Sequence, residues 1–259
     1  MSARAPQSWS TAGAPASWIV EIRLALSFLT ILPLAPRRAA PEAVPRSFRW
    51  FALAGFTIGA ALCFENWLLG LVFERLVRSS LIILSLAIVT GAVHLDGLAD
   101  TADALGAGRD RARALEIMRD SRIGSFGALA LIFVLALKVA ALAALTGTVR
   151  YAALWLAPGL ARWAMVASAD GLEYLRPRGA GTSLLGFDRH ALMVASLTAV
   201  LGALPILLAP TLRAYVVAVA MVLILRTVYR RWLGGITGDL LGAAGELIET
   251  AVLLAMCAR

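Results

Sequence analysis

The sequence contains few charged residues and few of the residue types that form disulfides and zinc sites. Charged residues occupy 15% of its 259 positions, and it has two cysteines and two histidines. A typical soluble domain carries about 25% charged residues. Cys63 and Cys257 both lie inside apolar runs, which predicts small buried side chains rather than a disulfide or metal pair. The shortage of charge argues against a soluble globular domain.

Apolar residues make up 60% of the chain and occur in runs long enough to cross a bilayer. The sequence therefore predicts an all-α fold, a polytopic integral membrane helical bundle with about seven transmembrane helices and an N-terminal interfacial helix. The predicted spans are approximately 50–73, 81–95, 125–145, 151–168, 191–209, 212–228 and 240–256. No internal repeat of fixed period is visible, so residues 18–259 are expected to form a single helical membrane domain.

The first 35 residues differ from the spans that follow. Residues 1–17 lack the apolar core of a signal peptide and predict a disordered N-terminal tail. Residues 18–35 are apolar but carry Glu21 and Arg23 near their start, and a proline at position 33 stops the run. Because this stretch is too polar at one end for a span, we expect a helix that lies at the cytoplasmic interface.

Positive charge is carried almost wholly by arginine, since Lys138 is the only lysine among 24 basic residues. The arginines lie in short connections between apolar runs, which argues against a nucleic-acid partner. Alternate connections hold four (37–49), five (109–122), three (176–189) and two (230–231) arginines, whereas the connections between them hold two, one and one. Cytoplasmic loops are enriched in basic residues. The alternation predicts a multi-pass protein of the cell inner membrane, with its polar motifs on the cytoplasmic side.

Three aspartates follow the second predicted span at positions i, i+4 and i+7: Asp96, Asp100 and Asp103. On a helix they lie on one face, where they repel each other unless a cation compensates. Acids at a helix end are also common for electrostatic reasons alone. Oxygen ligands at a membrane surface suit Mg²⁺ or Mn²⁺, which bind a few carboxylates together with substrate phosphate. The row therefore predicts a site for such a cation.

A second polar group precedes the third predicted span, in the sequence Arg119-Asp120-Ser121-Arg122. The positive-inside bias accounts for the arginines but not for the carboxylate and hydroxyl between them. Arginine's planar set of donors suits phosphate oxygens. We expect Arg119, Ser121 and Arg122 to bind substrate, and Asp120 to contact it as well.

The last predicted span carries a third group of acids. Asp239 and Glu246 are seven residues apart and share a helix face, and Glu249 follows three residues later. Acids inside spans are costly and usually face a polar interior. We expect Glu246 to pair with Arg162, which also lies inside an apolar run, and the two to line a cavity; a purely structural pair is the alternative.

Long stretches of the chain resemble the cobalamin synthase (adenosylcobinamide-GDP ribazoletransferase) family. The resemblance is carried by HLDGLADTADALG at 94–106, ALEIMRDSRIGSFGALAL at 114–131, FLTILPL at 28–34, ARWAMV at 161–166 and TGDLLGAAGELIETAVLL at 237–254. Gly245 stands where the family usually has asparagine, and residues 1–17 are extra.

The resemblance implies the last assembly step of cobalamin (vitamin B12) biosynthesis. Adenosylcobinamide-GDP would react with α-ribazole or its 5′-phosphate and release GMP, with Mg²⁺ as cofactor. In this interpretation Asp96, Asp100 and Asp103 hold the metal ion and Asp103 or Asp120 is the base. Substrate would be bound by Arg119, Ser121, Arg122, Arg162, Asp239 and Glu246. A homo-oligomer is expected by analogy.

Two other functions fit parts of the pattern. Prenyltransferases also bind a diphosphate through Mg²⁺ and aspartate-rich motifs, but the aspartate spacing and the segment DSRIG at 120–124 favour the first interpretation. A secondary transporter would use Glu65, Glu246 and Glu249 as ion sites, which predicts binding groups near the middle of the bilayer and paired half-repeats.

Overall fold

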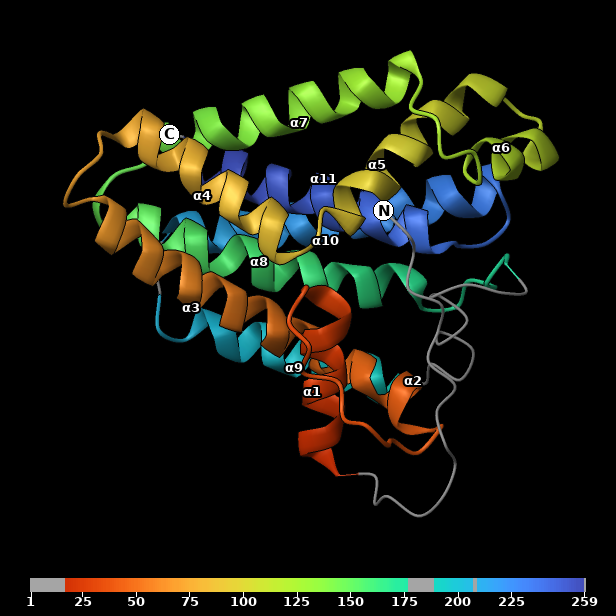
Figure 1. Ribbon diagram of the computed structural model, residues 1–259, viewed down its shortest axis with the longest axis horizontal. Coiled ribbons are helices and arrows are strands. Elements are labelled where there is room, and N and C mark those ends of the chain that lie inside the picture. Colours follow the sequence, from red (N-terminus) through yellow and green to blue (C-terminus); the bar gives the residue numbers. More distant parts are fainter. Residues whose placement is uncertain (1–16, 177–188, 207–208, 259) are drawn as a thin grey trace.

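A computed structural model describes residues 17–176, 189–206 and 209–258 (Figure 1). The described residues form helices and include no β-strand, which confirms the predicted all-α class. The elements are α1 (Trp18–Leu29), α2 (Ala43–Ser47), the 3-10 helix η1 (Phe48–Trp50), α3 (Phe51–Leu69), α4 (Arg75–Val89), α5 (Val93–Ala104), the 3-10 helix η2 (Leu105–Ala107), α6 (Arg111–Ile117), α7 (Ser125–Ala144), α8 (Gly147–Ala169), α9 (Arg189–Ala203), α10 (Ala209–Trp232) and α11 (Gly238–Cys257). The predicted tail 1–17 lies almost wholly outside the described residues.

The two most buried helices, α8 and α11, pack against each other at the centre of the bundle. Helix α3 packs along α8, and α5 and α10 pack along α11. Two glycines of α3 explain its close approach, because a Cβ atom at Gly55 or Gly59 would collide with the backbone of Pro158 or Trp155. This is the close helix packing that small residues one turn apart allow in membranes.

A helix occupies each of the seven predicted span positions. Four stretches are long and apolar enough to cross a membrane: Ala43–Leu69, Ser125–Ala144, Ala209–Trp232 and Gly238–Cys257. Helices α4 and α5 together make a fifth, broken candidate. Helix α9 has only 15 residues, and α8 carries buried Arg150 and Arg162 within its length. By length and apolar composition, four helical stretches therefore qualify as membrane spans, or five when the bent pair α4–α5 is counted as one span.

A sharp elbow separates α4 from α5, and it makes the predicted span 81–95 wrong at its end. Helix α4 stops at Val89, and the backbone passes through Gly91 and Ala92 with φ of 63° and 54°. The two helical segments meet at 90°. Glycine adopts positive φ without strain, whereas alanine does so at a cost. The elbow makes α5 a separate helix that carries the acidic row.

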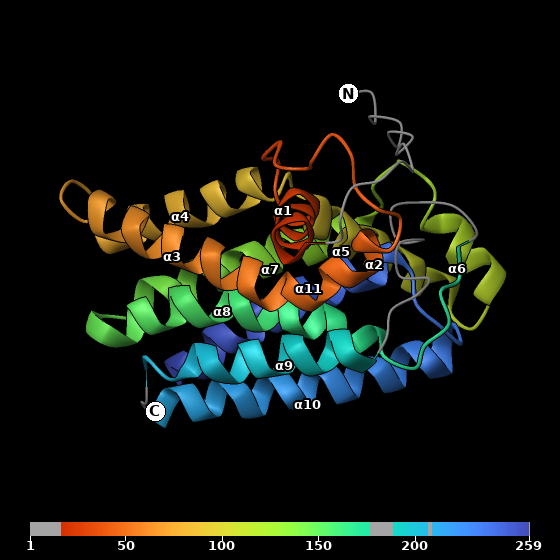
Figure 2. The ribbon, with the colours of Figure 1, turned by 90° about the horizontal axis from the view of Figure 1, so that it is seen from below.

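The long helices run back and forth between two ends of the bundle (Figures 1 and 2). The connections 70–74 and 145–146 lie at one end with the C-terminus. The other end, called the polar end below, carries residues 105–124, 170–176 and 233–239. Helix α1 lies across the direction of the long helices, upright in Figure 1 and nearly end-on in Figure 2. This orientation is the one expected of an interfacial helix.

Candidate active site

A cavity of about 680 Å³ opens at the polar end, between α5, the connection from α6 to α7, and the start of α11. It brings together residues from all three groups predicted from the sequence. Its polar lining consists of Asp96, Asp100, Arg119, Asp120, Ser121, Arg122, Arg176 and Asp239. An apolar wall continues from it toward α7 through Leu131 and Leu135. The cavity therefore combines carboxylates, arginines and an apolar surface.

Close packing of α5 on α11 places the carboxylates near one another. A Cβ atom on Gly97 would lie 2.8 Å from the carbonyl oxygen of Asp239, so only glycine lets the helices meet there. Asp100 experiences the negative charges of Asp96, Asp103 and Asp239, and the positive charge of Arg176 opposes them. This excess of negative charge favours a bound cation.

The structure places Asp103 apart from the other two aspartates of the row. Its carboxylate accepts hydrogen bonds from the backbone N–H groups of Gly124 and Gly127, at 2.7 and 2.8 Å. These amides belong to the start of α7, where backbone donors have no partner within the helix. Asp103 does not line the cavity. Asp103, for which the sequence predicts a role as metal ligand or base, thus holds the start of α7 against α5.

No cluster of three or more His, Cys, Asp or Glu side chains suited to a metal ion occurs in the described ranges. The predicted set of three row aspartates is therefore not assembled. Asp96 and Asp100 remain on the cavity wall, joined there by Asp239 from α11. Carboxylate oxygens of this kind fit Mg²⁺, which completes its shell with water and substrate phosphate.

Asp120 and Arg122 form an ion pair at the cavity mouth. Arg122 donates from Nε and Nη2 to the Asp120 carboxylate, with the shortest distance 2.6 Å, and its backbone N–H also donates to that group. These bonds lower the pKa of Asp120 to about 2. A general base works best when its pKa is near the operating pH. The pairing therefore disfavours Asp120 as the base and leaves it as the residue that orients Arg122.

Arg176 is a cavity residue to which the sequence analysis gave no role. Its guanidinium donates to the Asp239 carboxylate and, at 3.1 Å, to the backbone carbonyl of Met118. It thus joins the segment after α8 to α11 and to the end of α6. The connection that carries Arg176 also holds acidic residues and other arginines. Such mixed charge is ordinary in a loop, so the sequence did not single out Arg176. The signal available was the shortness of the connection to α8, which keeps Arg176 near the polar end.

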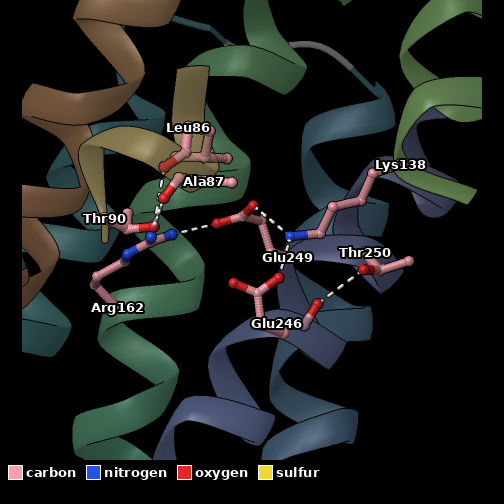
Figure 3. Close-up of polar contacts among 8 residues, drawn as sticks. All are labelled: Leu86, Ala87, Thr90, Lys138, Arg162, Glu246, Glu249 and Thr250. Atoms are coloured by element: carbon pink, nitrogen blue, oxygen red, sulfur yellow. Dashed lines mark hydrogen bonds and ion pairs between the residues drawn. The ribbon is translucent and has the colours of Figure 1, made fainter. Parts of the chain in front are cut away.

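The remaining predicted site residues, Arg162 and Glu246, lie in a buried charge network rather than on the cavity wall (Figure 3). Lys138 of α7 donates to Glu246 and Glu249 of α11, at 2.5 and 2.7 Å. Arg162 of α8 donates to Glu249. The predicted pair between Glu246 and Arg162 is therefore wrong, because Glu246 faces α7 and Glu249 faces α8. Lys138 is 2% exposed, and the network cross-links three helices behind the cavity.

Fold and site together define a polytopic helical membrane protein with a polar cavity of carboxylates and arginines at one end of its bundle. The sequence family described as cobalamin-5-phosphate synthase matches residues 21–257. The chain therefore belongs to that family.

Several curated proteins are similar to this chain over nearly their whole length. Each of the following is named adenosylcobinamide-GDP ribazoletransferase. The protein of Syntrophobacter fumaroxidans is 42% identical over 89% of this chain and 95% of its own length. That of Roseiflexus sp. is 39% identical over 97% of this chain and 92% of its own length. That of Stutzerimonas stutzeri is 40% identical over 92% of this chain and 98% of its own length. No solved structure matches the chain significantly.

Proposed function

We propose that the chain is an adenosylcobinamide-GDP ribazoletransferase, the enzyme of the last assembly step of cobalamin biosynthesis. The observation that carries the proposal is the family match over residues 21–257, together with similar proteins of that name. The cavity at the polar end adds physical support, because a diphosphate needs the arginines and carboxylates that converge there.

The reaction is a transfer at phosphorus. A hydroxyl oxygen of α-ribazole, or of its 5′-phosphate, attacks the cobinamide-side phosphorus of adenosylcobinamide-GDP. The new P–O bond forms as the bond to the bridging oxygen breaks, and GMP leaves with that oxygen. The hydroxyl proton passes to a base. Such a step depends on positioning and on stabilising the charge of the transferred group.

The cavity arginines supply the positive charge in this proposal. Arg119, Arg122 and Arg176 would contact diphosphate oxygens, and the Ser121 hydroxyl would donate one further hydrogen bond. Arg122 is 87% exposed, so its pairing with Asp120 leaves the guanidinium accessible to an incoming anion. Asp239 would keep Arg176 pointed at the substrate.

The carboxylates of the cavity divide between metal binding and proton transfer. Asp96 and Asp100 would hold Mg²⁺ together with water and phosphate oxygens of the substrate, and the bound ion would neutralise the diphosphate and polarise its phosphoryl oxygens. The base would be Asp96 or Asp100, because Asp103 accepts from two backbone amides and Asp120 is engaged by Arg122. The arginine-rich connections support a cytoplasmic location for the polar end and an inner-membrane location for the bundle.

The test is an assay of detergent-purified protein with adenosylcobinamide-GDP, α-ribazole and Mg²⁺. The proposal predicts equal amounts of GMP and adenosylcobalamin, no GMP when α-ribazole is omitted, and loss of turnover in EDTA that added Mg²⁺ restores. Folded protein that forms neither adenosylcobalamin from α-ribazole nor adenosylcobalamin 5′-phosphate from α-ribazole 5′-phosphate would contradict it.

A further inference from the structure

A second, smaller cavity lies away from the site described above, between α2, η1 and the start of α9. Its volume is about 270 Å³, and its side chains include Arg46, Arg49 and His190. Arg46 and Arg49 are three residues apart in a continuous helical stretch and so share one face. His190 comes from the first turn of α9, which packs against η1. General enrichment of arginine in cytoplasmic loops does not explain the convergence of these three groups on one cavity.

Arg49 is held in place by a buried acid. Glu21 of α1 is 1% exposed, and its carboxylate accepts from Arg49 Nε at 2.8 Å, from Arg49 Nη2 at 2.6 Å and from Trp50 Nε1 at 2.9 Å. A buried carboxylate is tolerated only when it is paired in this way. The bonds use one edge of the guanidinium, and Nη1 has no acceptor among the described residues. Arg49 can therefore still donate into the cavity.

The second arginine of this cavity has no acidic partner among the described residues. Arg46 is exposed and forms no ion pair within the part of the chain that the structure describes. The first turn of the 15-residue helix α9 adds the partial positive charge of a helix N-terminus. An anion with several oxygen acceptors, such as a phosphate group, fits these donors.

An apolar strip begins directly beside the cavity. Counted from His190, the exposed side chains Met193, Leu197 and Leu201 follow at positions +3, +7 and +11, so they share its helix face, and exposed Leu204 lies in the turn directly after α9. At about 1.5 Å per residue the helical part of the strip, from 193 to 201, is about 12 Å long. One leaflet of a bilayer core is about 15 Å thick. The strip therefore covers most of the length of an acyl chain.

We propose that the Arg46–Arg49–His190 cavity binds the phosphate of an anionic phospholipid whose acyl chain lies along α9. The lipid headgroup binds in the cavity at the level of α1, and the acyl chain packs along the apolar strip. Free phosphate shares the headgroup chemistry but would gain nothing from the apolar strip, which is the reason for assigning a lipid. This inference does not depend on the proposed reaction.

Native mass spectrometry of the detergent-purified full chain tests the proposal, with phosphatidylglycerol as probe and phosphatidylcholine as the comparison whose headgroup has no net charge. Arg46→Gln should weaken phosphatidylglycerol binding about tenfold, the loss expected of one charge-assisted hydrogen bond. Arg38→Gln makes the same charge change at an exposed position of the same connection, outside the cavity. It should change the affinity less than twofold. Arg49 is left intact because its loss would leave the buried carboxylate of Glu21 without a cationic partner.

Leu197→Gln tests the acyl strip without altering the headgroup donors. It should weaken binding of dioleoyl phosphatidylglycerol but leave competition by water-soluble glycerophosphoglycerol unchanged. Unfolding temperatures equal to that of the wild type confirm that each variant is folded. Equal losses in Arg46→Gln and Arg38→Gln would overturn the proposal, since general charge attraction would then explain binding. Inorganic phosphate that binds as tightly as the lipid would also overturn it, in favour of a free-phosphate site.

Discussion

Arg176 and Asp239 are 63 positions apart in the sequence and form an ion pair on the wall of the polar-end cavity. Both side chains are 18% exposed, so the pair is partly shielded from water and remains open to a ligand. A phosphate group arriving beside Arg176 would meet a guanidinium already aimed by Asp239 and by the carbonyl of Met118. This pair connects the segment that follows α8 with the last helix.

Replacing Arg176 should impair binding of the diphosphate substrate. Arg176→Ala is expected to raise KM for adenosylcobinamide-GDP at least tenfold, because a charge-assisted hydrogen bond contributes about 1.5–3 kcal/mol. Arg176→Lys should recover part of the loss, since lysine keeps the charge without the planar set of donors. Steady-state kinetics in detergent with α-ribazole saturating provides the measurement. An unchanged KM in folded Arg176→Ala protein would remove Arg176 from the substrate site.

Asp103→Ala should act mainly on stability. The substitution leaves the backbone N–H groups of Gly124 and Gly127 without their acceptor. Gly124 is exposed, so water can replace the carboxylate there, whereas Gly127 is buried and an unpaired buried group costs about 1–3 kcal/mol. We expect a lower unfolding temperature and a smaller loss of turnover than in Asp96→Ala. Thermal unfolding and GMP release, measured on the same preparations, distinguish the two effects. Wild-type stability with abolished turnover would instead return Asp103 to the catalytic group.

The buried network predicts a compensating pair of substitutions. Lys138→Met leaves Glu246 without a cation and should destabilise the fold by about 3–5 kcal/mol, as expected when one partner of a buried pair is removed. Adding Glu246→Gln should recover much of that loss, because Arg162 still neutralises Glu249. A double-mutant cycle of unfolding free energies measures the coupling. Additive losses would show that Lys138 and Glu246 do not interact.

The pH dependence of turnover should not report Asp120. Hydrogen bonds from Arg122 lower its pKa from the ordinary 3.8 to about 2, so the carboxylate stays ionised from pH 5 to 9. A lowered pKa stabilises the folded state above pH 3.8, and that contribution is lost as the pH falls toward 2. Asp120→Asn should therefore lower the rate without moving the acid limb of the pH–rate profile. A shift of that limb would show that Asp120 is the titrating group.

Helix positions could be predicted from the sequence because apolar runs and arginine-rich connections alternate along it. The elbow could not, since residues 81–95 contain no proline, aspartate, glutamate, lysine or arginine that would mark a break, and the direction changes only in the backbone at Gly91 and Ala92. Asp96 and Asp100 were correctly placed on one face. Asp103 shares that spacing, but its carboxylate accepts hydrogen bonds from the backbone amides at the start of α7. The spacing of residues within one helix gives no information about such contacts with a neighbouring helix.

Tertiary pairing explains the other differences between prediction and structure. Glu246 and Glu249 lie three residues apart, and the choice between Lys138 and Arg162 as partner depends on which helix packs against each face of α11. Arg176 belongs to a connection with mixed charge, where nothing in the local sequence distinguishes it from its neighbours. Residue types and helical periodicity therefore predicted which kinds of side chain gather at the cavity better than which individual residues line it.

The most direct test of the central claim is GMP release by Asp100→Asn protein, compared with wild type, as Mg²⁺ is varied at saturating adenosylcobinamide-GDP and α-ribazole. Asp100→Asn is nearly isosteric and removes one negative charge from the cavity wall. We expect at least a hundredfold loss of turnover, with an unfolding temperature no lower than that of the wild type, because mutual repulsion among the carboxylates is relieved. Turnover and Mg²⁺ dependence equal to those of the wild type would contradict the account and place the reaction elsewhere in the molecule.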